Sequence, residues 1–199
     1  LAGQTELTLD YLVYDTAKAC RILVKEYFPQ GIELKRMGGE LGVVNEADGA
    51  AYQEGLAAFI QRGKALVTLR QPNLVEHFDL LSQAGTAYLA QAWIDGPSLE
   101  EHLMELGVKA QPSEQQISTW GKAIAEALAY CHQQGLNHLH IRPSDIRLVH
   151  GNTPVIVGFM AGKPDGDDLC SRNDAYWAPE QLTSVEATAL SDIYSFGAL

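Results

Sequence analysis

The sequence predicts an α+β protein of two lobes, in which a β-rich lobe precedes a helix-rich one. Alternating and β-branched stretches dominate the first 92 residues, and a single helical segment interrupts them. After Trp93 the apolar residues change to helical spacing. We therefore predict a β-rich lobe at residues 1–92, a connector at 93–97 and a helix-rich lobe at 98–199.

Strands and one long helix are expected in the first lobe. The stretches ELTLDYLVYD and CRILVKEYF have the composition of strands, and LVEHFDLLSQAGTAYLAQAWI is typical of two strands joined by a turn at Gly85. The helix is expected over residues 50–69 and is stopped by Pro72. Its apolar residues at helical spacing are Leu56, Phe59, Ile60, Leu66 and Leu69.

Helices and a small hairpin are expected in the second lobe. The stretch PSLEEHLMEL predicts one helix, and PSEQQISTWGKAIAEALAYCHQQG predicts a longer one with Ser113 as its N-cap and Gly135 as its C-terminal stop. The apolar runs IRLV and PVIV flank the turn HGNT and predict a hairpin. The Gly- and Asp-rich stretch AGKPDGDDLCSRND indicates a loop, and LSDIYSFGAL begins a further helix.

The composition excludes some function classes. The 199 residues include 14 basic and 25 acidic side chains, a net charge of −11, which argues against a nucleic-acid surface. No apolar run approaches the roughly 20 residues of a membrane span, and no signal peptide opens the chain. Because the sequence starts without Met and stops inside an apolar pattern, we expect it to be part of a larger protein.

The cysteines indicate a reducing compartment. Cys20, Cys131 and Cys170 are widely spaced and contain no C-x-x-C pair. This pattern indicates neither a disulfide framework nor a thiolate zinc site. A cytoplasmic location is the simplest expectation.

The order of motifs resembles the bacterial-type, or eukaryotic-like, Ser/Thr protein kinase family, and the resemblance covers essentially the whole chain. ILVKEYFP is similar to the strand-three lysine motif, with Lys25 as its lysine, and LRQPNLV to the turn after helix αC. YLAQAWIDGPSLEEHL resembles the hinge and αD, HLHIRPSDI the catalytic loop, VGFMAG the D-F-G segment, WAPEQL the A-P-E segment, and SDIYSFG the start of αF. The resemblance implies a bilobal kinase-like fold with a C-lobe that stops at αF.

The nucleotide-contacting positions depart from this family's pattern. Gly3 matches the first glycine of the Gly-rich loop, but Thr5 and Thr8 replace the next two, and a Cβ there obstructs the approach of phosphates to backbone amides. Counting back from QPNLV places Arg62 at the αC glutamate position, with Glu54 eight residues earlier on the same helix. The usual ion pair of Lys25 is therefore not expected.

The adenine pocket is altered in the same way. Asp10, Leu23 and Arg147 stand where the family has small or apolar side chains around the base. Burying a charge without a partner is costly, so we expect ATP to fit badly. Alternatively, Asp10 and Arg147 turn outward, which would weaken this expectation, or pair with each other across the cleft and close it. Any residual nucleotide contacts would come, by resemblance, from Gly3, Lys25, Ala92, Trp93 and Asp145.

The chemical positions of the catalytic loop are degenerate. Leu139 and His140 replace the Arg and the catalytic Asp, and Arg142 replaces the loop Lys. Asp145 takes the Asn position, and Gly158 replaces the D-F-G aspartate, so one carboxylate remains for Mg²⁺. We expect no catalytic residue, no bound metal and no cofactor.

Residues that hold the family's fold are present. By resemblance, Leu66, His138, Phe159 and Asp192 form one packed column, Met160 replaces the last D-F-G glycine, and Glu180 awaits a basic partner. Ser171 lies in the segment that carries activating phosphorylation in kinases, but residue 139 is not the arginine that would bind a phosphate there.

The sequence is therefore interpreted as a pseudokinase domain in a bacterial cytosolic protein, with a regulatory or scaffolding role. Its expected partner is another protein, such as an active kinase or a signalling component. Trp93, Trp120 and Trp177 are candidate anchors for such a contact or, alternatively, core residues.

Three alternatives remain open at this stage. An unconventional kinase would bind ATP and transfer phosphate with Lys25, His140 and Asp145, since an imidazole can accept a proton near neutral pH. Lys25 could instead bond a backbone carbonyl or Glu26. A zinc site is the third alternative, and its candidate ligands are His132, His138, His140 and His150, which lack the spacing of a helical zinc pair.

Overall fold

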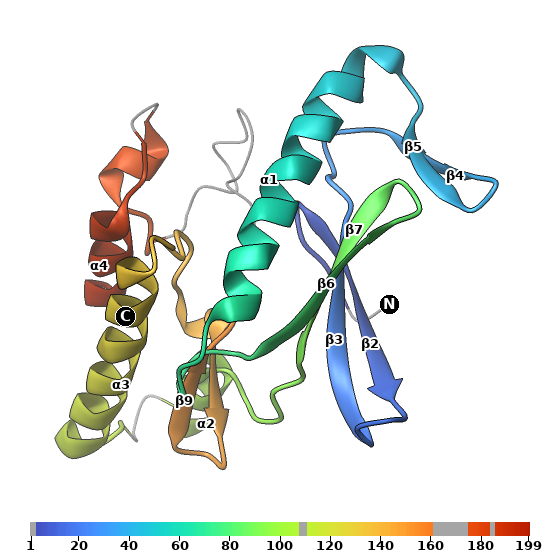
Figure 1. The fold of residues 1–199 in the computed structure, drawn as a ribbon. Helices are drawn as coiled ribbons and strands as arrows, with labels where there is room; N and C mark the ends of the chain where they lie inside the picture. Colours follow the sequence, from blue (N-terminus) through green and yellow to red (C-terminus); the bar gives the residue numbers. More distant parts are fainter. Residues whose placement is uncertain (1–2, 108–110, 161–174, 184–185) are drawn as a thin grey trace. The chain divides into compact units, whose positions relative to one another are not determined.

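The computed structural model describes residues 3–107, 111–160, 175–183 and 186–199 (Figure 1). These residues form two compact units. The N-terminal unit contains residues Leu1–Leu69 and Glu76–Trp93, and the C-terminal unit contains Arg70–Val75, Ile94–Phe159 and the described residues after 174. The predicted lobe boundaries at 92 and 98 stay predictions.

The N-terminal unit is built on an antiparallel sheet of order β1-β2-β3-β7-β6. The strands are β1 (Gly3–Gln4), β2 (Thr8–Asp15), β3 (Cys20–Tyr27), β6 (His77–Gln83) and β7 (Thr86–Ala92). β6 and β7 turn at Ala84 and Gly85, which both have positive φ, as a two-residue hairpin turn requires. The predicted turn at Gly85 is confirmed.

Helix α1 (Gly49–Thr68) follows a 3₁₀ turn, η1 (Glu46–Asp48), and contacts β6 and β7. Phe59 and Leu66 are buried, as their helical spacing predicts. The ring of Tyr27 on β3 lies 5.4 Å from the ring of Tyr52 and 5.4 Å from that of Phe59. These aromatic contacts fix α1 on one face of the sheet.

A second hairpin precedes α1, and the sequence interpretation missed it. It consists of β4 (Leu34–Met37) and β5 (Glu40–Val43), shown in light blue in Figure 1. The signal was present, because two glycines, Gly38 and Gly39, separate the strands and both have positive φ. The Leu41 N–H donates to the Ala84 carbonyl at 2.8 Å, which ties the inserted hairpin to the β6–β7 turn.

The C-terminal unit contains the helices and a small hairpin. Its elements are α2 (Leu99–Leu106), α3 (Glu114–Gln133), η2 (Pro143–Asp145), β8 (Ile146–Val149), β9 (Thr153–Ile156), η3 (Pro179–Leu182) and α4 (Ala189–Gly197). Ser113 caps α3 by accepting the Gln116 N–H at 3.2 Å, and Gly135 adopts φ +72° just beyond the helix. Both predicted helix signals are confirmed.

The core of this unit lies between α3 and the β8–β9 hairpin. Ile124 and Leu128 of α3 are buried, as are Ile146, Leu148 and Ile156 of the hairpin. Trp120 is also buried, and its indole N–H donates to the Asn152 carbonyl at 2.8 Å. Of the two alternatives for Trp120, the core residue is therefore confirmed and the exposed anchor is wrong.

The fold class is confirmed as mixed α and β, with a sheet-based unit followed by a helical one. Within the described residues, none of the helices has the length and apolarity needed to cross a bilayer. The predicted loop at residues 161–174, including Cys170 and Ser171, lies outside the described residues.

Candidate functional site

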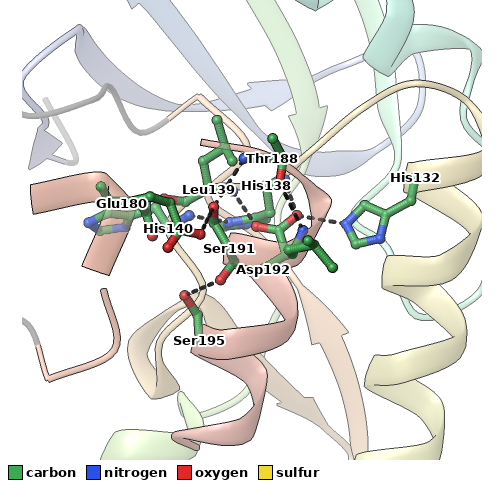
Figure 2. Close-up of polar contacts among 11 residues, drawn as sticks. His132, His138, Leu139, His140, Glu180, Thr188, Ser191, Asp192 and Ser195 are labelled. Atoms are coloured by element: carbon green, nitrogen blue, oxygen red, sulfur yellow. Dashed lines mark hydrogen bonds and ion pairs between the residues drawn. The ribbon is translucent and has the colours of Figure 1, made fainter. Parts of the chain in front are cut away.

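The segment that resembles a catalytic loop, residues 138–145, is held by a buried carboxylate of helix α4. Asp192 is fully buried, and its carboxylate accepts the His138 N–H at 2.8 Å and the Leu139 N–H at 2.6 Å (Figure 2). His132 of α3 contacts the same carboxylate through Nε2 at 2.8 Å. One side chain thus joins the loop to two helices.

This carboxylate supports a strained backbone. Leu139 has φ +67°, a conformation that costs an L-residue about 1–2 kcal/mol. The short charge-assisted bond from its N–H to Asp192 offsets that cost. The strain and its support explain how the loop keeps its shape although residue 139 carries an apolar side chain.

The imidazole ring of His138 is held by hydrogen bonds at both of its nitrogens. Its Nδ1 accepts the His140 N–H at 3.3 Å, so the proton lies on Nε2, which donates to the Val157 carbonyl at 2.7 Å. The ring of Phe159 meets it edge-on at 4.5 Å between centroids. His138, Phe159 and Asp192 are therefore packed in one chain of contacts, whereas Leu66 is buried in the other unit and its place in a column stays a prediction.

Glu180 has a partner within the described chain. The Ser191 hydroxyl, in the first turn of α4, donates to its carboxylate at 2.6 Å, and this hydrogen bond lowers the pKa of Glu180 below its ordinary value (Figure 2). Thr188 caps α4 by accepting the Leu190 N–H at 3.2 Å. The segment around Glu180 is thereby attached to the start of α4.

The degenerate catalytic positions form a cluster of their own around Asp145. The carboxylate of Asp145 lies 3.3 Å from Arg142 Nε and 3.4 Å from His140 Nδ1, through the same oxygen. The ring of Trp177 approaches that of His140 edge-on at 6.3 Å. The single carboxylate retained for metal binding therefore already has two nitrogen neighbours.

Gly158 closes the other side of Asp145. It adopts φ +89°, and a Cβ at this position would lie 2.7 Å from the second oxygen of Asp145. Gly158 itself offers no side-chain ligand, so Asp145 supplies the one carboxylate at the two positions that hold Mg²⁺ in protein kinases, the D-F-G aspartate and the catalytic-loop asparagine. Across the described residues, His, Cys, Asp and Glu side chains form no group of three or more that could hold a metal ion.

Arg147 contacts groups of its own unit. Its guanidinium donates to the Gly96 carbonyl at 3.2 Å and lies 3.4 Å from the Glu101 carboxylate. Glu101 also accepts the Ser98 N–H at 2.6 Å in the capping box of α2, and this bond is the main reason that its pKa falls below the ordinary value. Arg147 is therefore part of the attachment of α2 to β8.

Lys25 in the N-terminal unit pairs with Asp10. The two residues face each other in the register of β2 and β3, and Lys25 Nζ lies 2.5 Å from Asp10 Oδ2. Their side chains are 7% and 13% exposed. Bonding of Lys25 to a carbonyl or to Glu26, considered from the sequence, is thus wrong, because hairpin register places Asp10 opposite it.

Glu26 instead belongs to a separate cluster. Its buried carboxylate accepts the hydroxyls of Tyr11 at 2.8 Å and Tyr88 at 3.0 Å, and Arg36 of the inserted hairpin donates to it at 2.5 Å. Burial, first, and then these bonds to Glu26 raise the pKa of Tyr11, and burial likewise raises that of Tyr88. The cluster attaches β4 to the sheet.

The other N-terminal positions singled out around a nucleotide lie on the main sheet or at its end. Gly3 is exposed in β1, Leu23 is half-buried in β3, and the Ala92 N–H donates to the Glu76 carbonyl at 2.8 Å. The Arg21 guanidinium lies 6.0 Å from the Trp93 ring centroid. Their roles at a nucleotide stay predictions, as does the assignment of Arg62, half-buried, or Glu54, exposed, to the αC glutamate position.

Two groups that by resemblance would contact ATP or its metal have partners within their own units. The ammonium that would contact phosphates is paired with Asp10, and the retained metal carboxylate is in contact with Arg142 and His140. Phosphoryl transfer depends on such groups being positioned for the nucleotide and its metal. In this structure Lys25 and Asp145 contact other side chains of the protein.

Comparison with known proteins places this geometry in a family. Residues 43–199 match the protein kinase domain family. A probable serine/threonine-protein kinase of Streptomyces coelicolor is 27% identical over 177 residues, which are 82% of this chain and 26% of that protein. Serine/threonine-protein kinase PrkC of Bacillus subtilis is 27% identical over 156 residues, 75% of this chain and 24% of that protein. The chain thus spans about a quarter of the length of these relatives.

Solved structures have the same fold. The apo form of PpkA-294 superposes with a TM-score of 0.74 at 26% identity, covering 98% of this chain and 70% of that one. The kinase domain of Mycobacterium tuberculosis PknI superposes with a TM-score of 0.67 at 20% identity, covering 98% of this chain and 66% of that one. The family match, the bacterial relatives and the shared fold agree, and the chain belongs to the protein kinase domain family.

Proposed function

We propose that the chain is a pseudokinase domain of a bacterial cytoplasmic protein, which regulates or scaffolds signalling by binding another protein. In this proposal residues 1–92 and 98–199 are its two lobes and 93–97 its hinge. Its partner is an active kinase or another signalling component.

The observation that carries the proposal is the environment of Asp145. Two basic side chains, Arg142 and His140, contact its carboxylate, and Gly158 stands where a kinase has the metal-binding D-F-G aspartate. Both losses act on the metal clamp that neutralises charge during phosphoryl transfer. By contrast, the contacts of His138, Phe159 and Asp192 that support the loop are present.

Phosphoryl transfer tests the proposal directly. The purified chain is incubated with radiolabelled ATP and either Mg²⁺ or Mn²⁺, with a general Ser/Thr acceptor protein present, and incorporated phosphate is counted. We expect no incorporation above that of the Lys25→Met variant. Phosphate transfer that depends on Lys25 and on the metal would contradict the proposal.

The binding role is tested separately. Active Ser/Thr kinases and their substrates from the same genome are purified and titrated against the chain. Complex formation is followed by calorimetry without nucleotide. We expect at least one saturable complex, and its effect on the partner's activity is then measured. If neither these kinases nor their substrates bind the chain, the regulatory role is wrong.

An unconventional kinase is a second candidate, favoured by one observation. His140 Nδ1 lies 3.4 Å from Asp145 Oδ2, and a carboxylate beside an imidazole can orient it as a general base. In that case His140→Ala abolishes phosphate transfer, while His150→Ala, at an exposed histidine, leaves it unchanged. Equal transfer by both variants would exclude His140 as the base.

A further inference from the structure

The Lys25–Asp10 pair continues into a chain of hydroxyl groups. Thr8 is fully buried, and its hydroxyl donates to Asp10 Oδ1 at 2.7 Å. Thr5 Oγ1 lies 2.8 Å from Thr8 Oγ1. Because the hydroxyl proton of Thr8 points to Asp10, Thr5 is the donor in that bond. Four side chains, Thr5, Thr8, Asp10 and Lys25, thus form one connected relay, which we call the Asp10 relay.

The same relay engages the backbone of the loop that joins β1 to β2. Thr5 Oγ1 accepts the N–H of Thr8 at 3.0 Å and that of Leu7 at 3.3 Å. The N–H of Thr5 donates to the Thr8 carbonyl at 2.8 Å. Three donors of this segment, the N–H groups of Thr5, Leu7 and Thr8, are therefore satisfied by atoms of Thr5 and Thr8.

These donors are the kind that bind anions. Consecutive backbone N–H groups in a turn form a concave site for phosphate, and a lysine ammonium adds a positive charge. A glycine at position 5 would leave the Leu7 and Thr8 amides without the Thr5 hydroxyl as acceptor. A small apolar residue at position 10 would leave Lys25 without its carboxylate. The two substitutions thus supply internal oxygens to the donors that a phosphate would need.

We propose that the Asp10 relay is an internal block of anion binding: the Asp10 carboxylate and the Thr5 hydroxyl engage the ammonium and the loop amides that would otherwise bind the phosphates of a nucleotide. The block would prevent phosphate binding in the N-terminal unit. The altered residues around Asp145 in the C-terminal unit would instead prevent phosphoryl transfer. This inference rests on the proposed function in one respect, which is that the excluded ligand is taken to be a nucleotide.

The test compares nucleotide affinities of relay variants without metal. ATP and adenosine are titrated by calorimetry in the presence of EDTA into the wild-type chain, Asp10→Asn and Asp79→Asn. Asp79 is an exposed carboxylate of β6, so its variant matches the change in charge outside the relay. We expect ATP affinity to rise about tenfold or more in Asp10→Asn, because the competing charge is removed. The affinity of Asp10→Asn for adenosine and the affinity of Asp79→Asn for ATP should equal those of the wild type.

A second variant opens the loop and keeps the ion pair. In Thr5→Gly/Thr8→Gly the loop amides lose their internal acceptor, and a smaller gain in ATP affinity is expected. Melting curves without ligand establish which variants fold; if Asp10→Asn does not, the double glycine variant decides, and its failure to gain ATP affinity overturns the block. Adding Lys25→Met to Asp10→Asn should abolish the gain.

The outcomes separate the block from the proposed function. An ATP affinity that is equal in the wild type and folded Asp10→Asn, or an equal gain for adenosine, overturns the block and leaves the pseudokinase proposal standing. Phosphate transfer by the wild-type chain overturns the pseudokinase proposal. If Asp10→Asn still tightens ATP binding in that case, the block stands as a brake on an active enzyme.

Discussion

Two buried carboxylates, one in each unit, are satisfied in opposite ways. Asp192 of the C-terminal unit accepts two backbone N–H groups and an imidazole, and it fixes the path of the chain. Asp10 of the N-terminal unit accepts a hydroxyl and an ammonium, both from side chains. A hydrogen bond from a backbone N–H remains when the side chain of the donor residue is replaced. A hydrogen bond from a side chain is lost when that side chain is replaced. This difference explains why the loop keeps its path while its chemistry is altered.

The largest expected effect is the loss of the Asp192 carboxylate. Asp192→Ala leaves the N–H groups of His138 and Leu139 buried without an acceptor and removes the partner of His132, so the free energy of unfolding should fall by about 3–5 kcal/mol. Denaturant titration measures it. Ile193→Ala, an exposed position on the same helix, is the control and should cost far less. Equal costs for both variants would contradict a special role for Asp192.

Removing one partner of the N-terminal pair is the next test of the comparison. Asp10→Leu leaves the Lys25 ammonium buried without its carboxylate, and Lys25→Met leaves the Asp10 carboxylate without its ammonium, so each single variant should cost about 3 kcal/mol. The double variant Asp10→Leu/Lys25→Met replaces both charges with apolar groups and should recover most of that loss. A double-mutant cycle from denaturant titrations gives the coupling, and a double variant as unstable as the sum of its parts would disprove it.

A pH-dependent effect is expected from the tyrosines around Glu26. The pKa values of Tyr11 and Tyr88 are raised above their ordinary 10.0 in the folded state. The unfolded chain therefore releases these protons first, and the stability they contribute is complete below pH 10 and is lost as the pH rises through the folded values. Unfolding free energies from pH 9 to 12 should decline less steeply in Tyr11→Phe/Tyr88→Phe. An unchanged slope would contradict the raised values.

The smallest effect is expected at Leu139. Leu139→Gly removes the steric cost of φ +67° and also adds backbone freedom to the unfolded chain, so we expect a stabilisation of less than about 1 kcal/mol. Leu136→Gly, at a buried leucine of the same segment, should destabilise clearly. A large loss of stability in Leu139→Gly would show that its side chain, rather than the Asp192 bond, holds the loop.

Local signals in the sequence predicted much of the fold. Ser113 caps the start of helix α3 and Gly135 lies just beyond its end, as predicted, and Gly85 lies in the predicted turn. The inserted hairpin was missed although Gly38 and Gly39 mark its turn, because four-residue strands give only a weak strand pattern. Local signals therefore predicted helix caps and a turn, and they were too weak to reveal two strands of four residues each.

The site was less predictable for a physical reason. The position of Lys25 was found from its motif, but its partner depends on the pairing of β2 with β3 across a turn. That register could have been counted from the strands on each side of residues 16–19. The contact between Ser191 and Glu180 and that between Arg36 and Glu26 join segments through tertiary packing, and neither has a local sequence signal.

The bond between Asp192 and the backbone of the loop has an evolutionary consequence. Every residue except proline has an amide proton, so changes at residues 139 and 140 to any other residue do not remove the bonds that position the loop. A gene under weak selection for catalysis can therefore accumulate substitutions there while its product remains folded. The same tolerance makes the segment a natural site for library design, in which side chains are varied on a frame that the buried carboxylate maintains.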